Sequence, residues 1–142
     1  MGVFLDTGFF LGICHPADTY NKRSNELLRA ISTGQFGLIY TSPLIISEAA
    51  TLLLIRTHNN QELINDFYDL LYGENHFARI LSWSKEIEQK TWNFFKSKNK
   101  KAKSKKEYMS FVDASSVVFC REYKIDNIIA FDGDFDNFII RL

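Results

Sequence analysis

The chain has 142 residues, enough to bury a hydrophobic core without disulfide or metal cross-links. Apolar residues make up 46% of the chain, which excludes a disordered or fibrous composition. Seventeen basic and seventeen acidic residues cancel, so the net charge favours no class of partner. The charge is nevertheless unevenly placed, because seven lysines fall within residues 96–106, where no acid occurs, and the rest of the chain is acidic.

The N-terminal half alternates between strand-like and helix-like segments. The apolar run at the start predicts a buried strand, and apolar residues at helical spacing predict the helices. Ser42-Pro43 is a strong helix start, with serine at the N-cap and proline at the first helical position. The predicted elements are a strand at 3–6, a helix at 18–32, a strand at 38–41 and helices at 44–56 and 61–72. The helix at 44–56 is apolar on nearly every face, which predicts that it is buried.

The C-terminal half continues the alternation. The predicted elements are a strand at 77–81, helices at 84–96 and 108–123, and strands at 127–131 and 138–140, with Ser110 as the cap of the second helix. The lysine-rich stretch at 96–106 has no periodicity, and we interpret it as an insertion or loop within a single domain, 1–142. Strands that alternate with helices predict an α/β fold, with a parallel β-sheet flanked by α-helices on both sides.

The two cysteines, Cys14 and Cys120, stand in apolar surroundings without the spacing of a zinc site or a disulfide framework. They predict buried, reduced thiols and a cytoplasmic location. The N-terminus has no basic region of the kind that opens a signal peptide, and no apolar run reaches ~18 residues. We therefore expect no membrane association.

Four carboxylates stand in segments that otherwise favour burial: Asp6, Glu48, Asp113 and Asp132. Asp6 is the only charged residue before His15, Glu48 interrupts the apolar helix, and Asp132 directly follows a predicted strand. A buried carboxylate needs a paired charge or a coordinated metal. Because no Arg or Lys occurs in these four stretches, the pattern indicates one shared metal site.

The predicted topology brings the four acids together. Asp6 and Asp132 each follow a parallel strand, and open α/β sheets bind ligands at the C-terminal ends of their strands, near the point where strand order reverses. Glu48 and Asp113 lie near the starts of helices that can face the same edge. Such an all-oxygen ligand set suits Mg²⁺ or Mn²⁺.

Each acid also has a local interpretation. Asp113, three residues after Ser110, fits a variant of the capping box, and Asp132 before Gly133 fits a turn. Asp6 could cap a helix that begins near Thr7. Glu48 is the hardest to explain locally, since a residue within a helix finds no free backbone donor. The four acids together favour a shared site over four separate local roles.

In order and surroundings, these segments resemble the PIN domain family of ribonucleases. The matching stretches are Leu-Asp-Thr at 5–7, Thr-Ser-Pro-Leu-Ile-Ile-Ser-Glu at 41–48, Ser-Phe-Val-Asp-Ala at 110–114 and Ala-Phe-Asp-Gly-Asp-Phe at 130–135. The resemblance spans residues 3–138. It implies one or two divalent ions held by the acids and endonucleolytic hydrolysis of RNA phosphodiesters. Many members with this pattern are VapC-type toxins that pair with a small antitoxin protein.

The resemblance assigns roles residue by residue. Asp6, Glu48, Asp113 and Asp132 match the family's acidic quartet, and Thr7 matches a small hydroxyl residue that helps to position the first acid. Asp134 and Asp136 are further candidate metal ligands, and which of the last three acids binds metal stays open. The family's Thr two residues before the fourth acid is Ala130 here. Homodimers are common in the family, and the apolar face of the helix at 61–72 could form such an interface.

The acids place negative charge where an RNA backbone must bind, so substrate binding requires cations. The candidates are the lysines of the basic stretch, Lys98, Lys100, Lys101, Lys103, Lys105 and Lys106. Phosphate contacts of this kind weaken as the salt concentration rises. A solvated loop with no role in RNA binding fits the same composition equally well.

Two other functional classes remain. A phosphoryl-transfer enzyme with Asp6 as its nucleophile is disfavoured, because aspartate-nucleophile phosphatases typically carry a second Asp two residues on, where this chain has Gly8. A non-catalytic PIN-like module that binds nucleic acid or joins a complex would bind metal without cleaving RNA. Within the nuclease interpretation, a toxin and an RNA-processing nuclease that is not a toxin are both open.

Overall fold

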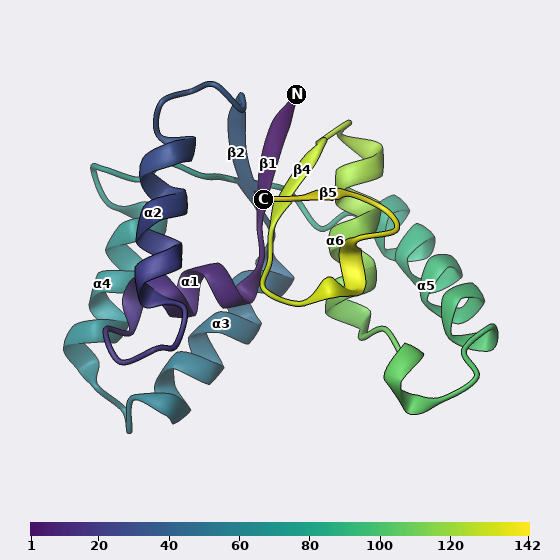
Figure 1. The fold of residues 1–142 in the computed structure, drawn as a ribbon, viewed down its shortest axis with the longest axis horizontal. Helices are drawn as coiled ribbons and strands as arrows, with labels where there is room; N and C mark the ends of the chain where they lie inside the picture. Colours follow the sequence, from purple (N-terminus) through teal and green to yellow (C-terminus); the bar gives the residue numbers. More distant parts are fainter.

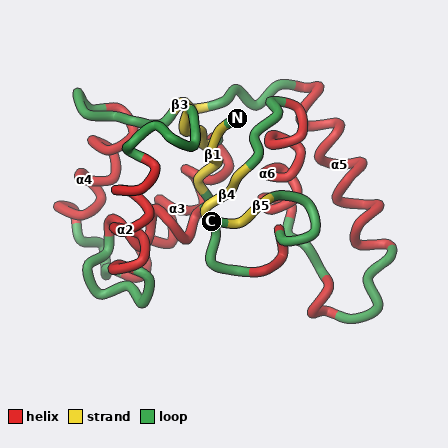
Figure 2. The backbone as a smooth tube through the Cα atoms, turned by 45° about the horizontal axis from the view of Figure 1, so that its top comes forward, coloured by secondary structure: helices red, strands yellow, loops and turns green.

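The computed structural model describes residues 1–142, and its centre is a sheet of five parallel strands in the order β3-β2-β1-β4-β5. The strands are β1 (Gly2–Leu5), β2 (Leu38–Thr41), β3 (Arg79–Ile80), β4 (Asn127–Ile129) and β5 (Ile140–Arg141). The central strand β1 is buried along its whole length, which its apolar side chains on both faces allow. Figure 2 shows the strands between two groups of helices.

Six helices cover the two faces of the sheet (Figure 1). One layer consists of α1 (Thr7–Cys14), α2 (Asn21–Ile31), α3 (Pro43–Arg56) and α4 (Gln61–Tyr72). The other consists of α5 (Lys85–Lys100) and α6 (Phe111–Glu122), which pack against each other. Two short 3-10 helices, η1 (Lys105–Glu107) and η2 (Gly133–Phe135), stand before α6 and after β4. The predicted α/β fold with a flanked parallel sheet is therefore confirmed.

The predicted caps are present. The Ser42 hydroxyl accepts a 3.4 Å hydrogen bond from the Ile45 N–H at the start of α3, with Pro43 at the first helical position. The Ser110 hydroxyl accepts a 3.0 Å bond from the Asp113 N–H at the start of α6. These bonds fix where both helices begin, so they also fix the positions of the acids in their first two turns.

One helix was missing from the predicted elements. Strand β1 ends at Leu5 rather than Asp6, and α1 follows at once. Most of α1 is apolar and buried, so its sequence lacks the polar face that reveals a helix by periodicity. It is enclosed by α2, α3 and α4, which leaves it almost no side exposed to water.

The predicted burial of the helix at 44–56 on nearly every face was wrong. Only Ile45, Ala49 and Leu53 of α3 are buried, while Leu54 is 41% and Ile55 61% exposed. The reason is that α3 packs against α1 and α4 on one side, while its other side faces the solvent. An apolar composition therefore did not imply a buried helix here.

The lysine-rich stretch is also not a loop throughout. Helix α5 continues to Lys100, so residues 96–100 form its last turn, and only the remainder of the stretch connects α5 to α6. Lysine is a good helix former, and the positive charges of Lys98 and Lys100 stabilise the C-terminal end of a helix. The bounds of the short strands β3, β4 and β5 also differ from the predicted ones by up to two residues at either end, at sheet edges or where the chain bends into the site.

The interior is a single hydrophobic core that includes both cysteines, which are buried and unpaired. No helix has the combination of length and hydrophobicity that a bilayer span requires.

Candidate metal centre

A cleft of about 370 Å³ opens at the C-terminal ends of β1 and β4, and all four acids of the quartet line it. They come from four distant segments: Asp6 follows β1, Glu48 lies in the second turn of α3, Asp113 in the first turn of α6, and Asp132 follows β4. Because β2 and β4 lie on opposite sides of β1, this is the point where the strand order reverses. The site therefore stands at the edge that the sequence indicated.

Asp6 is the buried member of the cluster, with only 8% of its surface exposed. It occupies the N-cap position of α1, yet its side chain makes no capping hydrogen bond. Its Oδ1 atom and the hydroxyl of the neighbouring Thr7 are both buried without any hydrogen-bond partner. The local interpretation of Asp6 as a helix cap therefore does not account for its carboxylate, and Thr7 makes no hydroxyl bond that would position it.

Asp113 uses its backbone and its side chain for different purposes. The backbone N–H donates to the Ser110 hydroxyl, which is the first half of a capping box. The return bond from the Asp113 carboxylate to the Ser110 N–H is absent. The half-buried carboxylate is therefore free to line the cleft.

Asp132 and Asp134 lie on one tight turn after β4. The Asp132 Oδ1 atom accepts a 2.8 Å hydrogen bond from the Asp134 N–H, so the predicted turn chemistry is present. Both side chains are exposed, which corrects the expectation that Asp132 is buried. Carboxylate oxygens of Asp113, Asp132 and Asp134 all lie within 4.8 Å of one another, close enough to hold one metal ion.

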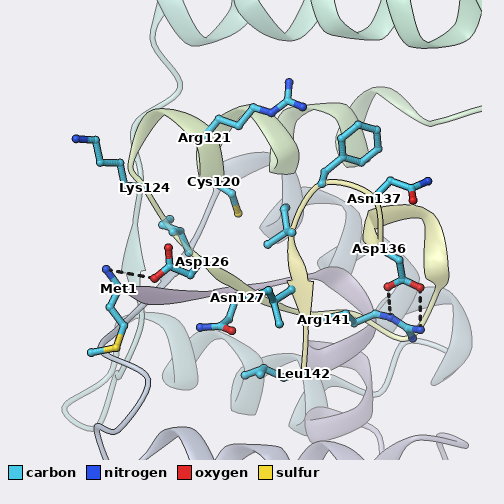
Figure 3. A pocket seen from close by; sticks show the side chains of 14 residues that line it. Met1, Cys120, Arg121, Lys124, Asp126, Asn127, Asp136, Asn137, Arg141 and Leu142 are labelled. Carbon is cyan, nitrogen blue, oxygen red and sulfur yellow. Dashed lines mark hydrogen bonds and ion pairs between the residues drawn. The ribbon is translucent and has the colours of Figure 1, made fainter.

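Asp136 belongs to a different part of the surface. It forms a two-pronged ion pair with Arg141, with distances of 2.7 Å to Nε and 3.2 Å to Nη2. Figure 3 shows this pair in a separate pocket of about 1130 Å³ between α6 and the ends of β4 and β5. Of the last three acids, Asp132 and Asp134 thus remain as candidate metal ligands, while Asp136 already has a cationic partner.

Burial and mutual repulsion shift Asp6, Asp113 and Asp134 toward their protonated forms. Burial, and then the negative charge of Asp113, raises the pKa of Asp6 to about 8. Burial and the charges of Asp132, Asp134 and Glu48 raise the pKa of Asp113 to about 7. Burial and Asp132 also raise the pKa of Asp134, while the positive charge of Lys98 acts in the opposite direction. Bringing these ionised carboxylates together therefore costs free energy in the folded protein.

This donor set fits a hard divalent cation. None of Asp6, Glu48, Asp113, Asp132 and Asp134 takes part in a salt bridge. Five carboxylates without a cationic partner, one of them with an orphaned buried oxygen, are the oxygen ligands that Mg²⁺ and Mn²⁺ prefer.

The lysine-rich stretch has a defined path beside this cluster. The Asn99 side chain accepts a 2.9 Å bond from the Met109 N–H and donates a 3.0 Å bond to the Met109 carbonyl, which ties the two ends of the connection together. Within it, the Lys98 ammonium donates to the Glu107 carbonyl. Figure 1 shows the connection at the same end of the molecule as the turn that carries Asp132 and Asp134. Lys98, whose charge lowers the pKa of Asp134, is the candidate among the lysines that acts on the acids of the cluster.

Sequence reasoning missed four residues that line the cleft: Asp18, Tyr20, Arg56 and Phe131. Arg56 forms a 3.7 Å ion pair with Asp18, and the rings of Tyr20 and Phe131 are stacked. One signal was available, because Glu48, Leu52 and Arg56 are spaced by four and all line the cleft from α3. Nothing in the sequence distinguishes Asp18 or Tyr20 from ordinary residues of a helix-starting turn.

Comparison with known proteins supplies the fold family. No protein-family model matches the sequence, and no curated protein matches it either. Among solved structures, VapC20 from Mycobacterium tuberculosis, a sarcin-ricin loop cleaving toxin, superposes with a TM-score of 0.77 over 95% of this chain and 93% of that chain, at 22% identity. The chain has a VapC-like PIN-domain fold.

A second match agrees with this assignment. FitAcB from Neisseria gonorrhoeae superposes with a TM-score of 0.61 at 14% identity, over 99% of this chain and 96% of that chain. The PIN-domain fold therefore accounts for nearly the whole chain. The resemblance inferred from four short stretches is confirmed at the level of the fold.

Proposed function

We propose that this protein is a metal-dependent endoribonuclease whose catalytic acids are Asp6, Glu48, Asp113 and Asp132. The observation that carries the proposal is the convergence of these acids, from four distant segments, on one cleft in which no cation of the chain pairs with them. Such a cluster is costly to maintain unless it binds a metal. The shared fold with a toxin that cleaves RNA supports RNA as the substrate.

We assign the metal ligands to Asp113, Asp132 and Asp134, with Asp6 and Glu48 completing the carboxylate lining. A bound Mg²⁺ or Mn²⁺ would supply Lewis-acid activation of water and would neutralise charge on the phosphate. Burial and the charge of Asp113 keep the pKa of Asp6 high, which disfavours full ionisation of the site without a cation. Thr7, with its buried hydroxyl unpartnered, offers a further oxygen beside the first acid.

The chain's own cations must attract the RNA. Lys98 stands near the acids, and Lys100, Lys101, Lys103, Lys105 and Lys106 extend a basic surface from it. In this proposal the lysines bind phosphates of the RNA backbone outside the cleft, and the acids act on the phosphodiester within it.

The biological role that the fold comparison favours is the toxin of a toxin–antitoxin pair in the cytoplasm, with a small antitoxin protein as partner. Exposed aromatic side chains Tyr68 and Tyr72 on α4 offer apolar surface for a second copy of the chain. A toxin slows growth when expressed alone and is neutralised by the product of an adjacent gene, whereas an RNA-processing nuclease does neither. Molar mass in solution measures the oligomeric state.

The first experiment is cleavage of a panel of structured and single-stranded RNAs by purified protein with Mn²⁺, Mg²⁺ or EDTA. Asp6→Asn and Asp113→Asn proteins run in parallel, with Asp69→Asn on the exposed side of α4 as the matched control. We expect metal-dependent cleavage by wild type and control, and a loss of about a hundredfold or more in the two site variants. Equal cleavage by all four proteins would identify a contaminant. Metal binding without cleavage would favour the non-catalytic module.

A further inference from the structure

The rim of the acidic cleft carries two stacked aromatic rings. Tyr20 and Phe131 lie with their centroids 4.2 Å apart and an angle of 4° between their planes, and both line the cleft with Asp6 and Asp132. Phe131 is half-buried, while 44% of Tyr20 is exposed. One face of the tyrosine ring is therefore covered by Phe131, while the exposed part of Tyr20 can be reached by a ligand that enters the cleft.

The surrounding structure holds this stack in place. The Tyr20 N–H donates a 2.8 Å hydrogen bond to the Asp18 Oδ1 atom, and the Tyr20 carbonyl accepts a 2.8 Å bond from the Ser24 N–H. On the other side, the Phe131 ring lies against Gly8, where an added Cβ would stand 3.1 Å from the ring. The backbone of Tyr20 and the ring of Phe131 are thus held by contacts outside the stack itself.

The same aspartate also holds a cation beside the stack. The Asp18 Oδ2 atom lies 3.7 Å from Arg56 Nη1, and the Asp18 side chain is only 10% exposed, whereas that of Arg56 is half exposed. Asp18 therefore accepts the backbone N–H of Tyr20 through one oxygen and pairs with the Arg56 guanidinium through the other. An aromatic face next to a cation is the combination by which proteins bind single-stranded nucleic acid, the ring stacking on a base and the cation contacting the backbone.

We propose that Tyr20 is a stacking site for one base of single-stranded RNA, and that Arg56 contacts a neighbouring phosphate. The inference rests on the proposed function, because it places this base beside the phosphodiester that lies at the acids. Stacking on a ring face does not depend on the hydrogen-bonding groups of the base, so the site accepts any of the four bases. The base must be unpaired in order to stack on the ring. We therefore expect the protein to be specific for RNA that is unpaired near the cleavage position.

The test is an eight-nucleotide single-stranded RNA that carries one 2-aminopurine, whose fluorescence is quenched by stacking. It is titrated with the Asp113→Asn protein, which leaves the RNA intact, and with the same protein carrying Tyr20→Ala, Tyr20→Phe or Tyr123→Ala in addition. Tyr123 is the matched control, since it is 47% exposed and lies at the far end of α6. We expect quenching in the parent, Tyr20→Phe and Tyr123→Ala proteins, and an absence of quenching with about tenfold weaker binding in Tyr20→Ala.

Two outcomes would overturn the stacking site: unchanged quenching and affinity in Tyr20→Ala, or no RNA binding by the parent protein. A Tyr20→Leu variant, which retains apolar bulk against Phe131 without a ring, replaces Tyr20→Ala if the latter does not fold. Cleavage of the RNA panel by the wild-type protein is measured in a separate experiment. A nuclease whose cleavage requires the acids but is indifferent to Tyr20 would retain the proposed function and lose only this inference.

Discussion

The backbone N–H of Asp6 donates a 3.1 Å hydrogen bond to the carbonyl oxygen of Ile129. The last residue of β4 thereby fixes the residue that follows β1, and the chain reaches Asp132 only three residues later. The sheet itself therefore sets the spacing between the backbones of Asp6 and Ile129, and Asp132 follows on a tight turn. Catalytic groups held on regular elements keep their geometry better than groups on loops.

Stability of the metal-free protein should fall as the pH rises. The pKa of Asp6 is about 8 and that of Asp113 about 7, both above the value of an unfolded chain, so the folded state binds more protons between pH 4 and 8. The free energy of unfolding should therefore decrease across this window. Asp6→Asn should stabilise the protein at pH 8 by roughly 1–3 kcal/mol and have little effect at pH 4.

Urea denaturation in EDTA at pH 4 and pH 8 measures this effect. Asp69→Asn, an exposed aspartate outside the cluster, should show no pH-dependent gain. Equal stability gains at both pH values would mean that Asp6 is not the origin of the pH dependence.

Divalent cations should reverse that trend. Mn²⁺ should raise the unfolding temperature of wild type more at pH 8 than at pH 6, because binding displaces protons from the acids. Asp113→Asn and Asp134→Asn should weaken Mn²⁺ binding by at least about tenfold. Asp136→Asn should retain the affinity, because Asp136 pairs with Arg141 outside the cleft. Isothermal titration calorimetry of wild type and the three variants measures their affinities for Mn²⁺. A weaker affinity in Asp136→Asn would contradict the ligand assignment.

Gly12 allows α1 and α2 to approach closely. A Cβ at this position would collide with the Ser24 hydroxyl and would lie 2.8 Å from the Ser24 Cβ and 3.1 Å from the Tyr20 carbonyl oxygen. Gly12→Ala should therefore destabilise the protein by roughly 1–3 kcal/mol, the usual cost of overpacking. Because the Ser24 hydroxyl is buried without a partner, Ser24→Ala should be neutral or stabilising.

A double-mutant cycle of these two changes isolates the contact. Gly12→Ala should cost less in the Ser24→Ala background than in wild type, since the nearest colliding atom is absent there. Additive effects in urea denaturation would place the strain elsewhere.

The lysines beside the acids should control how RNA cleavage depends on salt. Changing Lys98 and Lys103 to Gln should reduce the slope of log(kcat/KM) against log salt by about 0.7 for each phosphate of a single strand that no longer binds a lysine. The matched control changes Lys85 and Lys124, exposed lysines at the start of α5 and just after α6. If both double variants shift the slope equally, net charge rather than the basic surface attracts the RNA.

Sequence reasoning succeeded where periodicity and spacing carry physical information. Alternating strands and helices fix a parallel sheet, and charge within apolar segments identified acids that meet in one cleft. It failed for α1, whose burial on every side removes the periodic signal, and for the exposed Leu54 and Ile55, whose environment depends on packing between layers. The pairing of Asp18 with Arg56 could not be foreseen, because only the tertiary structure brings the two residues together.

The parallel pairing of β1 with β4 has a consequence for protein synthesis. The ribosome delivers Asp6 first and Glu48 soon after, but Asp132 and Asp134 emerge only after almost all of the other elements have left the ribosome. A pairing between segments so far apart in sequence forms late and slowly. A nascent chain therefore holds an incomplete set of acids until β4 and the turn after it have been synthesised, so the cleft is assembled only late in the folding of residues 1–142.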